Sequence, residues 1–344
     1  MINYSLTYDD VQIVPEYSEI ESRSLCNIST RFTKNFNIDI PIVSSPMDTV
    51  TGTKMAIEIS KLGGVGCIHR FMSISEQTKA VYDVYKETKN PKTTSICAAI
   101  GVKNYEERLD TLIKNGANVI LIDVAHGNTL LVKNTIAYIK KNYSVDVIAG
   151  NVATFEGAEN LCKWGADAVR CGIGNGSVCE TRIRSGIGVP QITALIECSK
   201  ACKFYGVPLI ADGGIRLIGD IAKAIAIGNA DSVMLGSLLS GTKESPGSIQ
   251  KVGKWPNEQL YKKYRGSASL DTKISNNISE KNVEGNSTLV PYKGKIKRII
   301  NDINDGLRSS MSYTNSLNLK EFKSSKFVTV TQSGIIEATP HLLK

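Results

Sequence analysis

Residues 172–182 read Gly-Ile-Gly-Asn-Gly-Ser-Val-Cys-Glu-Thr-Arg and carry more potential chemistry than any other segment of this chain. Three glycines in five residues let the backbone turn sharply and bring its N–H groups close to a ligand. Ser177 adds a hydroxyl, and Cys179 is followed two residues later by the hydroxyl of Thr181. A thiol in this place is suited to attack an electrophilic carbon beside a bound anion. Taken alone, the segment is equally compatible with a small buried cysteine in a turn.

The other cysteines show no ligand pattern. They stand at positions 26, 67, 97, 162, 171, 198 and 202, and none forms a CxxC pair. Several, such as Cys67 and Cys97, lie inside apolar runs. We therefore expect reduced core residues rather than disulfides or zinc ligands.

Short apolar, β-branched runs recur along the chain, and most are followed by a helical pattern. The runs are residues 41–47, 64–69, 96–101, 119–125, 147–152, 168–174, 208–214 and 232–237. Continuous apolar strands that alternate with helices are typical of a parallel sheet covered on both faces. Eight such units are the number that closes a (β/α)8 TIM barrel, which is the α/β fold that we predict.

Polar residues and glycines gather where these runs end, for example at Ser45, His69, Asp123, Asn151 and Asp212. In a barrel all of these ends open on one face, which is where active sites lie. A doubly wound sheet would instead concentrate function at one switch point. The distribution therefore favours the barrel.

Two segments fall outside the eight units. Residues 1–40 form an N-terminal prelude of polar strands and turns. Residues 241–295 form a long polar loop or flap region, in which 270–282 looks mobile, and 296–344 a C-terminal helix and tail. A long loop at the catalytic end of a barrel is usually a lid. We see no second domain, so residues 1–344 are expected to form a single catalytic domain.

Composition limits the partners. The net charge of +8 comes from basic residues spread along the chain, and only 6% of residues are aromatic. We therefore expect no nucleic-acid partner, whereas a phosphorylated small molecule fits the mild basic excess. No apolar run approaches the ~20 residues of a membrane span, and the N-terminus lacks the features of a signal peptide. The expectation is a soluble, cytoplasmic protein without membrane contact.

Together these segments resemble the IMP dehydrogenase/GMP reductase family nearly end to end. The resemblance is carried by residues 6–11, 44–50, 122–127, 149–152, 172–182, 210–216 and 290–294, which include Leu-Thr-Tyr-Asp-Asp-Val and Ala-Asp-Gly-Gly-Ile-Arg. It implies that Cys179 attacks C2 of a purine nucleotide. Dehydrogenases then pass hydride to NAD and hydrolyse the adduct to XMP. Reductases expel ammonia from GMP and accept hydride from NADPH to give IMP.

Three features favour the reductase branch. Only 26 residues separate His69 from Ile96, so the CBS modules that dehydrogenases commonly insert there are absent. Between Ser269 and Glu284 there is neither Arg nor Tyr, whereas dehydrogenases use an Arg-Tyr pair on the flap to activate water. Residues 264–269 and 282–285 resemble bacterial reductases, although 189–193 and 45–47 look more like dehydrogenases. We expect a GMP reductase. A dehydrogenase without CBS modules and a catalytically silent nucleotide-binding barrel are the alternatives.

The resemblance also assigns roles. Cys179 would be the nucleophile, and Thr181 with Glu284 would relay a proton to the leaving ammonia. The predicted nucleotide-binding residues are Ser45, Met47, Ser177, Asp212, Gly213, Gly214, Gly236, Ser237, Tyr264, Gly266, Ser267 and Ala268. The predicted NADPH-binding residues are Asp123, Ala125, Asn151 and Arg170, and the carbonyls of Gly174, Gly176 and Cys179 would hold a possible potassium ion. Family members are typically homotetramers.

Simpler interpretations remain open for some of these residues. Asp212 could merely end a strand, Arg170 could be a structural ion-pair partner, and Glu284 a surface carboxylate. Histidines at strand ends, such as His69 and His126, are more often structural than catalytic.

Two residues depart from the family pattern. Asn175 stands where proline or a small residue is usual, which predicts a less rigid cysteine loop. Glu180 stands where a neutral residue is usual, and its carboxylate would oppose thiolate formation unless it pointed to solvent or paired with Arg182.

Overall fold

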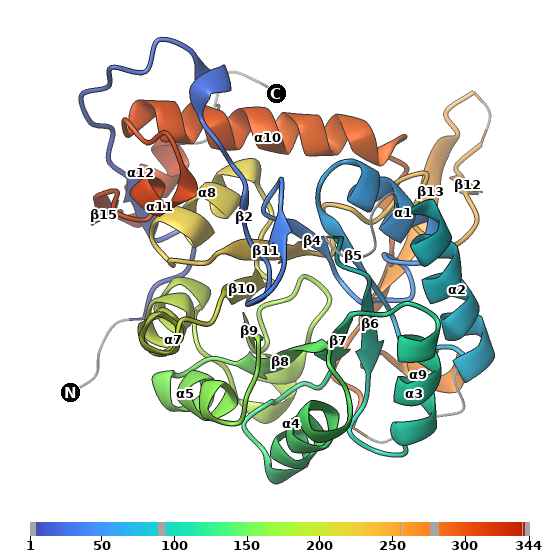
Figure 1. The fold of residues 1–344 in the computed structure, drawn as a ribbon. Coiled ribbons are helices and arrows are strands. Elements are labelled where there is room, and N and C mark those ends of the chain that lie inside the picture. Colours follow the sequence, from blue (N-terminus) through green and yellow to red (C-terminus); the bar gives the residue numbers. More distant parts are fainter. Residues whose placement is uncertain (1–4, 89–93, 255, 276–281, 339, 341–344) are drawn as a thin grey trace.

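The computed structural model describes residues 5–88, 94–254, 256–275, 282–338 and 340. Eight parallel strands close a barrel in the order β10-β11-β4-β5-β6-β7-β8-β9 (Figure 1). The strands are β4 (Ile42–Ser44), β5 (Val65–Ile68), β6 (Cys97–Ile100), β7 (Val119–Ile122), β8 (Asp146–Val152), β9 (Ala168–Cys171), β10 (Leu209–Asp212) and β11 (Ser232–Leu235). Each predicted apolar run overlaps one of them, so the predicted TIM barrel is confirmed.

Most barrel strands end two or three residues before the predicted runs do. The run 168–174 leaves the sheet after Cys171, and the run 232–237 leaves it after Leu235. Glycines follow both strands, and Gly172 has a φ of 143°, which turns the chain out of the ladder. The glycines and polar residues at the strand ends therefore belong to loops above the barrel.

A helix follows each barrel strand, directly or after an excursion. These helices are α1 (Thr53–Lys61), α2 (Ile74–Glu87), α3 (Glu106–Lys114), α4 (Leu130–Asn142), α5 (Phe155–Lys163), α7 (Gln191–Tyr205), α8 (Ile218–Ala226) and α10 (Ile296–Tyr313). In α10, buried Ile296, Ile300, Ile303 and Leu307 recur every three or four residues, as an amphipathic helix requires. Figure 1 shows α10 lying along the outside of the barrel near α1 and α8.

The barrel interior is closed at one end. Its packed side chains include Val43, Leu121 and Ile148, and Phe32 from the prelude is fully buried against them. Phe32 lies between β2 (Thr30–Arg31) and β3 (Asn37–Ile38), which form a hairpin across this end. Asp146 fixes the hairpin by accepting bonds from the Thr33 hydroxyl at 2.5 Å and the Asn35 amide at 2.7 Å. Ligands must therefore enter from the opposite face.

The prelude and the C-terminal tail meet on the barrel's outer surface. Strand β1 (Val11–Ile13) pairs antiparallel with β15 (Phe327–Thr329). The remaining short elements here are η1 (Arg23–Leu25), α11 (Leu319–Phe322) and α12 (Gln332–Glu337). The tail after α10 is thus more structured than the sequence analysis expected.

The region predicted as a polar loop, 241–295, contains regular structure. Strands β12 (Gln250–Val252), β13 (Gln259–Arg265) and β14 (Ser287–Pro291) form an antiparallel sheet. The segment expected to be mobile begins with a helix, α9 (Leu270–Ser275), while residues 276–281 lie outside the described part of the chain. The predicted polar segment after the eighth strand is thus present, and pairing between β13 and β14 satisfies much of its backbone.

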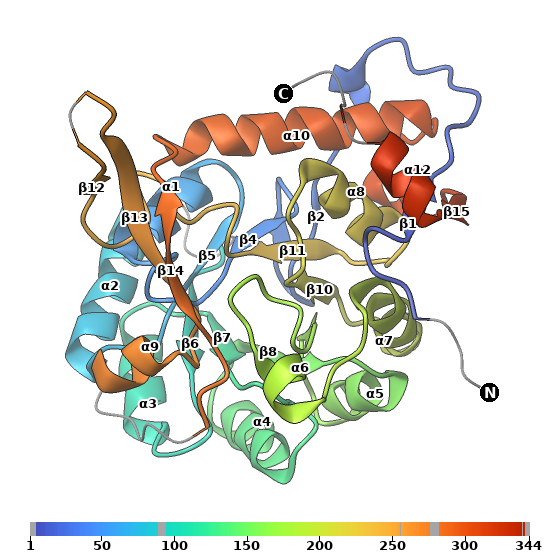
Figure 2. The same ribbon diagram turned by 180° about the vertical axis from the view of Figure 1, so that it is seen from behind.

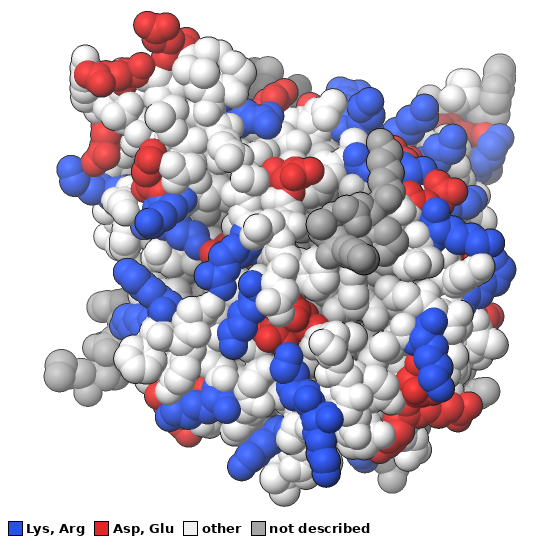
Figure 3. Space-filling view, in the orientation of Figure 1, with Lys and Arg blue, Asp and Glu red and all other residues white. Residues whose placement is uncertain are grey.

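Charged side chains of both signs lie on the surface. Figure 3 shows Lys and Arg side chains scattered over one face with acidic side chains between them. Within the described residues, no helix is both long enough and apolar enough to cross a membrane.

Candidate active site

The cysteine loop leaves β9 and ends in the short helix α6 (Thr181–Ser185). Its turns depend on glycines, since Gly174 has a φ of 72° and the Cys179 N–H donates to the Gly176 carbonyl at 3.0 Å. Cys179 is partly exposed, whereas the other seven cysteines are buried and unbridged. The loop therefore presents a single accessible thiol at the open end of the barrel.

Cys179, Thr181 and Glu284 form a continuous chain of polar contacts. The Cys179 Sγ lies 3.2 Å from the Thr181 hydroxyl oxygen, and that hydroxyl donates to Glu284 Oε2 at 2.8 Å. The backbone fixes the approach, because Glu180 N–H donates to the Glu284 carbonyl at 2.8 Å. A hydroxyl between a thiol and a carboxyl can pass a proton in either direction.

We call residues 264–275 and 282–285 the flap, since they lie over the open end of the barrel. Figure 2 shows α6, α9 and β14 on this same face. The flap is tied to the cysteine loop by the Asn286 N–H, which donates to the Val178 carbonyl at 2.9 Å, and by a β-bridge between Cys179 and Gly285. The nucleophile and the predicted acid are therefore held by one set of backbone bonds.

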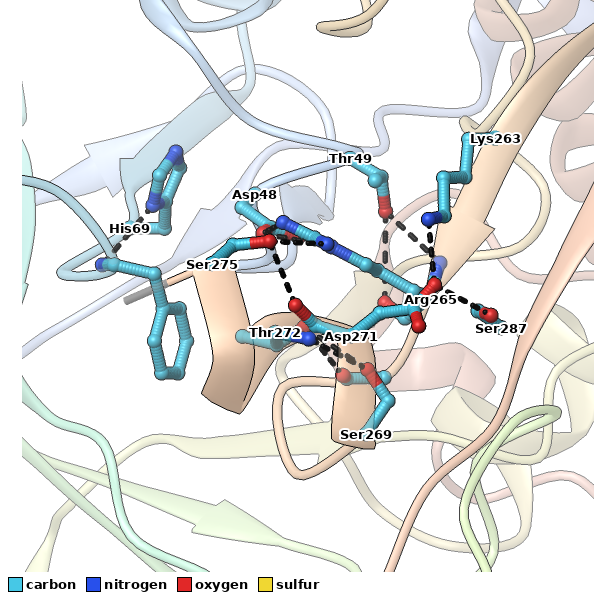
Figure 4. Close-up of polar contacts among 12 residues, drawn as sticks. Asp48, Thr49, His69, Lys263, Arg265, Ser269, Asp271, Thr272, Ser275 and Ser287 are labelled. Atoms are coloured by element: carbon cyan, nitrogen blue, oxygen red, sulfur yellow. Dashed lines mark hydrogen bonds and ion pairs between the residues drawn. The ribbon is translucent and has the colours of Figure 1, made fainter. Parts of the chain in front are cut away.

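A side-chain clamp fixes the base of the flap to the barrel (Figure 4). Arg265 Nε donates to Asp48 Oδ2 at 2.9 Å, and its backbone N–H donates to the Thr49 hydroxyl at 3.1 Å. On the other side of the flap, Asp271 pairs with Lys263 at 2.5 Å. Charged contacts thus attach the base of the flap to the barrel and to β13.

Tyr264 and Gly236 form the wall predicted to bind phosphate. Tyr264 is 4% exposed, and its hydroxyl lies 3.1 Å from the Ser177 hydroxyl. Burial raises the pKa of Tyr264, and the bond with Ser177 only partly opposes this, so the phenol stays a neutral hydrogen-bond donor. A Cβ on Gly236 would lie 3.1 Å from the Tyr264 hydroxyl and 3.3 Å from Met47 Sδ, so a side chain there would crowd the pocket.

A buried ion-pair network forms what we call the cavity floor, made of Asp123, Asn151, Arg170 and Asp212. Arg170 Nη1 donates to Asp123 Oδ1 at 2.8 Å, and its Nε donates to Asp212 Oδ2 at 3.0 Å. Asn151 Nδ2 also donates to Asp212 Oδ2, at 2.8 Å, so Asp212 Oδ1 can accept bonds from a ligand. Burial alone would lower the pKa of Arg170, but Asp212 and Asp123 outweigh it and raise that pKa above its usual value.

All of the predicted site residues line one cavity of about 390 Å³. They are Ser45, Met47, Asp123, Ala125, Asn151, Arg170, Gly174, Gly176, Ser177, Cys179, Thr181, Asp212, Gly213, Gly214, Gly236, Ser237, Tyr264, Gly266, Ser267, Ala268 and Glu284. The structure brings these residues together, while their individual roles remain predictions. The volume suits a mononucleotide-sized ligand.

The cavity also contains residues to which the sequence analysis gave no role. Arg70 and Phe71 follow β5, and the Arg70 guanidinium lies 4.8 Å from the centre of the Phe71 ring. Their position just after a barrel strand was the feature of the sequence that could have placed them at the site. Lys273 and Met234 also line the cavity. Lys273 could not have been found, because it reaches the cavity only through the fold of α9.

His69 is structural in its contacts. Its Nδ1 accepts the Phe71 N–H at 3.1 Å, which Figure 4 shows beside the flap. Burial lowers the pKa of His69 to about 4, although the charges of Asp48 and Asp123 partly oppose this. The imidazole is therefore neutral near pH 7, and it does not line the cavity.

Glu180 and Asn175, the two residues that depart from the family pattern, make other contacts than the sequence analysis expected. Glu180 does not pair with Arg182; its Oε2 accepts from Arg184 Nε at 2.9 Å. The reason is that α6 places residues four apart on one side of the helix. Asn175 does not loosen the loop either, because its side chain bonds to Gln191 and to the Asp212 carbonyl.

The predicted potassium ligands are backbone carbonyls of the cysteine loop. The Gly176 carbonyl already accepts the Cys179 N–H, so one of its lone pairs is used within the turn. Oxygen cages made of carbonyls suit a hard monovalent cation. Potassium binding by Gly174, Gly176 and Cys179 remains a prediction.

Comparisons with known proteins cover almost the whole chain. A family model described as the IMP dehydrogenase / GMP reductase domain matches residues 5–341. An inosine-5′-monophosphate dehydrogenase of Cryptosporidium parvum is 38% identical over 392 aligned positions, which cover 99% of this chain and 96% of that protein. One from Borreliella burgdorferi is 37% identical and covers 98% of this chain and 96% of its own length.

Among solved structures, a cysteine-to-alanine variant of GMP reductase from Trypanosoma brucei, in complex with guanosine 5′-monophosphate, superposes with a TM-score of 0.92. It is 30% identical and covers 99% of this chain and 98% of its own. The similar proteins therefore carry two different activities in their names.

Proposed function

Because the chain belongs to the IMP dehydrogenase/GMP reductase family of oxidoreductases, we propose that it is a GMP reductase, which converts GMP to IMP and ammonia with hydride from NADPH. The observation that carries this proposal is the contact chain from Cys179 through Thr181 to Glu284. The 2-amino group of GMP is a poor leaving group unless its nitrogen is protonated, so that it departs as ammonia. A carboxyl group that reaches the reacting centre through a hydroxyl can deliver that proton.

The residues would act in two steps. In the first, Cys179 Sγ bonds to C2 of GMP, the bond between C2 and the amino nitrogen breaks, and Glu284 supplies a proton through Thr181 to the departing ammonia. In the second, hydride takes the place of sulfur at C2, and the thiolate returns as IMP forms. NADPH supplies only that hydride. Ser177, Tyr264 and Asp212 would hold the nucleotide still through phosphate and ribose contacts.

The cavity floor fits a nicotinamide cofactor in one specific way. Asn151 Oδ1 is buried and has no hydrogen-bond partner. An unsatisfied buried acceptor is costly, and the carboxamide N–H of a nicotinamide is a donor that would satisfy it. Arg170 is neutralised by two carboxylates, so it would orient Asp123 toward the cofactor rather than bind its phosphates.

The composition of the flap supports the reductase over the dehydrogenase. A dehydrogenase must activate water to hydrolyse its adduct, and residues 269–284 contain neither the Arg nor the Tyr that the family uses for this. Without such a group hydrolysis should be slower by about 10²–10⁴. The Cryptosporidium relative aligns over 392 positions against 344 residues here, so that dehydrogenase carries segments that this chain lacks.

The alternative is an IMP dehydrogenase without CBS modules, which the names of the curated relatives favour. Absorbance of the reduced nicotinamide separates the two activities. One cuvette holds enzyme, GMP and NADPH, and the other holds enzyme, IMP, NAD and potassium. We expect a fall in the first and a flat signal in the second. A sustained rise in the second would establish the dehydrogenase, and no change in either would indicate a nucleotide-binding protein without turnover.

A further inference from the structure

The side-chain amides of Asn175 and Gln191 link the cysteine loop to the strand end that carries Asp212. Asn175 Nδ2 donates to Gln191 Oε1 at 2.6 Å and to the Asp212 carbonyl at 2.9 Å. Gln191 Nε2 donates to the Cys171 carbonyl at 3.0 Å and to the same Asp212 carbonyl at 3.2 Å. A side-chain amide offers two N–H donors, and both amides make two contacts with theirs. We call this pair the amide bridge.

The amide bridge begins where strand pairing stops. The last paired residues of β9 and β10 are Cys171 and Ala211. Beyond them the chains diverge into the cysteine loop and the turn after Asp212, and the amide bridge connects the next available carbonyls. It therefore extends the barrel by one layer of side-chain hydrogen bonds, directly beneath the nucleophile loop.

The space around Asn175 is shaped for this side chain. A Cβ on Gly172 would lie 3.1 Å from Asn175 Nδ2, and a Cβ on Gly213 would lie 2.6 Å from Asn175 Oδ1. Gln191 is only 3% exposed, so its amide is shielded from water. Buried polar groups of this kind are costly to leave unpaired, which makes the arrangement sensitive to loss of either amide.

We propose that Asn175 and Gln191 are positioning residues that fix the cysteine loop, and with it Cys179, relative to the ribose-binding carboxylate of Asp212. The inference rests on the proposed function, in which the sulfur must meet C2 of a nucleotide held through Asp212. A proline restricts the backbone of a loop because its ring fixes φ, whereas Asn175 restricts the cysteine loop through the hydrogen bonds of its side chain. The chain thus replaces the usual family residue with a different restraint.

The test is Asn175→Asp in the full chain, since aspartate keeps the size of the side chain and removes both donors. We expect kcat with GMP to fall by about 100-fold, the cost of a displaced reacting group. The GMP dissociation constant, measured by isothermal titration calorimetry, should rise much less than kcat falls. Iodoacetamide should label Cys179 faster than in the wild type, as followed by peptide mass spectrometry, because the loop is loosened.

The matched control is Asn142→Asp, at the C-terminal end of α4, where the exposed amide donates to the Tyr138 carbonyl. It should behave as the wild type does in all three measurements. If Asn175→Asp does not fold, Asn175→Ala is used with circular dichroism to confirm folding. A folded variant with wild-type kcat and labelling rate would overturn the proposal, as would a loss of GMP affinity equal to the loss in kcat. Labelling and calorimetry need no turnover, so they test the amide bridge even if the proposed reaction is not the one catalysed.

Discussion

The cavity floor and the flap each depend on an arginine, but the two arginines are held in different ways. Arg170 lies within barrel strand β9 and joins Asp123, after β7, to Asp212, at the end of β10. Arg265 ends β13 outside the barrel and reaches back to Asp48. One arginine is fixed by the continuous ladder of the barrel on both sides. The other, Arg265, forms the ion pair with Asp48 that attaches the base of the flap to the barrel.

Because of this difference, we expect the cavity floor to contribute mainly to the stability of the fold and the flap mainly to the rate of turnover. The floor is part of the closed barrel, so its groups can move only if the fold itself yields. The flap is attached through a few contacts, which is typical of segments that open and close in catalysis. Cys179 and Glu284 sit where the two regions meet. Substitutions in the floor should therefore affect unfolding, and substitutions in the flap should affect rate.

The largest effect is expected at the junction. Cys179→Ala removes the sulfur on which the proposed covalent step depends, so turnover should be abolished. GMP binding should remain measurable by calorimetry, because the phosphate and ribose contacts are untouched. Substantial remaining activity in this variant would exclude the covalent mechanism.

Glu284→Gln tests the flap side of the junction. The amide keeps the bond with Thr181 but cannot supply a proton, so ammonia release should slow by about 10²–10⁴. Stopped-flow measurement of ammonia release, with GMP affinity measured separately, distinguishes rate from binding. Glu258→Gln, at the residue before β13, where the carboxylate pairs with exposed Lys251, is the matched control. Equal rates in the two variants would remove Glu284 from the relay.

Arg170→Met tests the floor. It removes the cation that joins Asp123 to Asp212 and leaves Asp123 with the longer, 3.7 Å contact to Arg70, which should lower the free energy of unfolding by about 3–5 kcal/mol. Urea denaturation measures this, with exposed Arg298→Met as the control for loss of an arginine. A variant with the wild-type free energy of unfolding would show that the ion pairs of the cavity floor do not stabilise the barrel.

The pH dependence of stability reports on His69, between floor and flap. Its pKa of about 4 lies below the usual 6.5, so between these values the unfolded chain binds a proton that the folded chain does not. Stability should therefore fall as the pH falls, by about 2 kcal/mol between pH 6.5 and 5. His69→Gln removes the titrating group and should flatten this dependence in urea denaturation. Parallel curves for both proteins would contradict the assignment.

Arg265→Lys should have the smallest effect. It keeps the charge beside Asp48 but loses the fork of donors, so the flap should loosen at a cost of about 1 kcal/mol. We expect kcat/KM to fall while the free energy of unfolding barely changes. A lower free energy of unfolding with an unchanged kcat/KM would contradict the proposed difference between the cavity floor and the flap.

Much of the barrel was predictable because each strand is a continuous apolar run. The order of the strands then follows from right-handed βα connections. The spacing of Cys179 and Thr181 is local and could be read directly. Glu284 was found only through the motif around it, since it stands 103 positions after Thr181 and nothing in the sequence between them indicates that it returns to Thr181.

The failures have a common cause. Helix α6 is only five residues long, too short to leave a periodic pattern, so the pairing of Glu180 with Arg184 was missed. The sequence did not indicate the β13–β14 sheet, because its strands are polar. Lys262 in β13 is buried, and its ammonium group donates to the carbonyls of residues 242 and 245, which the sequence could not show. Asn175 looked like a loosening substitution because its partner, Gln191, is brought to it by the fold.

The separation of Thr181 from Glu284 also sets an order of events during synthesis. A ribosome adding 5–20 residues per second completes the cysteine loop roughly 5–20 s before it reaches Glu284. During about the first half of that interval β4 has no neighbour on its β11 side, because β11 lies midway between Thr181 and Glu284, and β1 waits for β15 until after Glu284 is made. The nascent chain therefore carries the Cys179 thiol before the flap residues that contact the cysteine loop have been made.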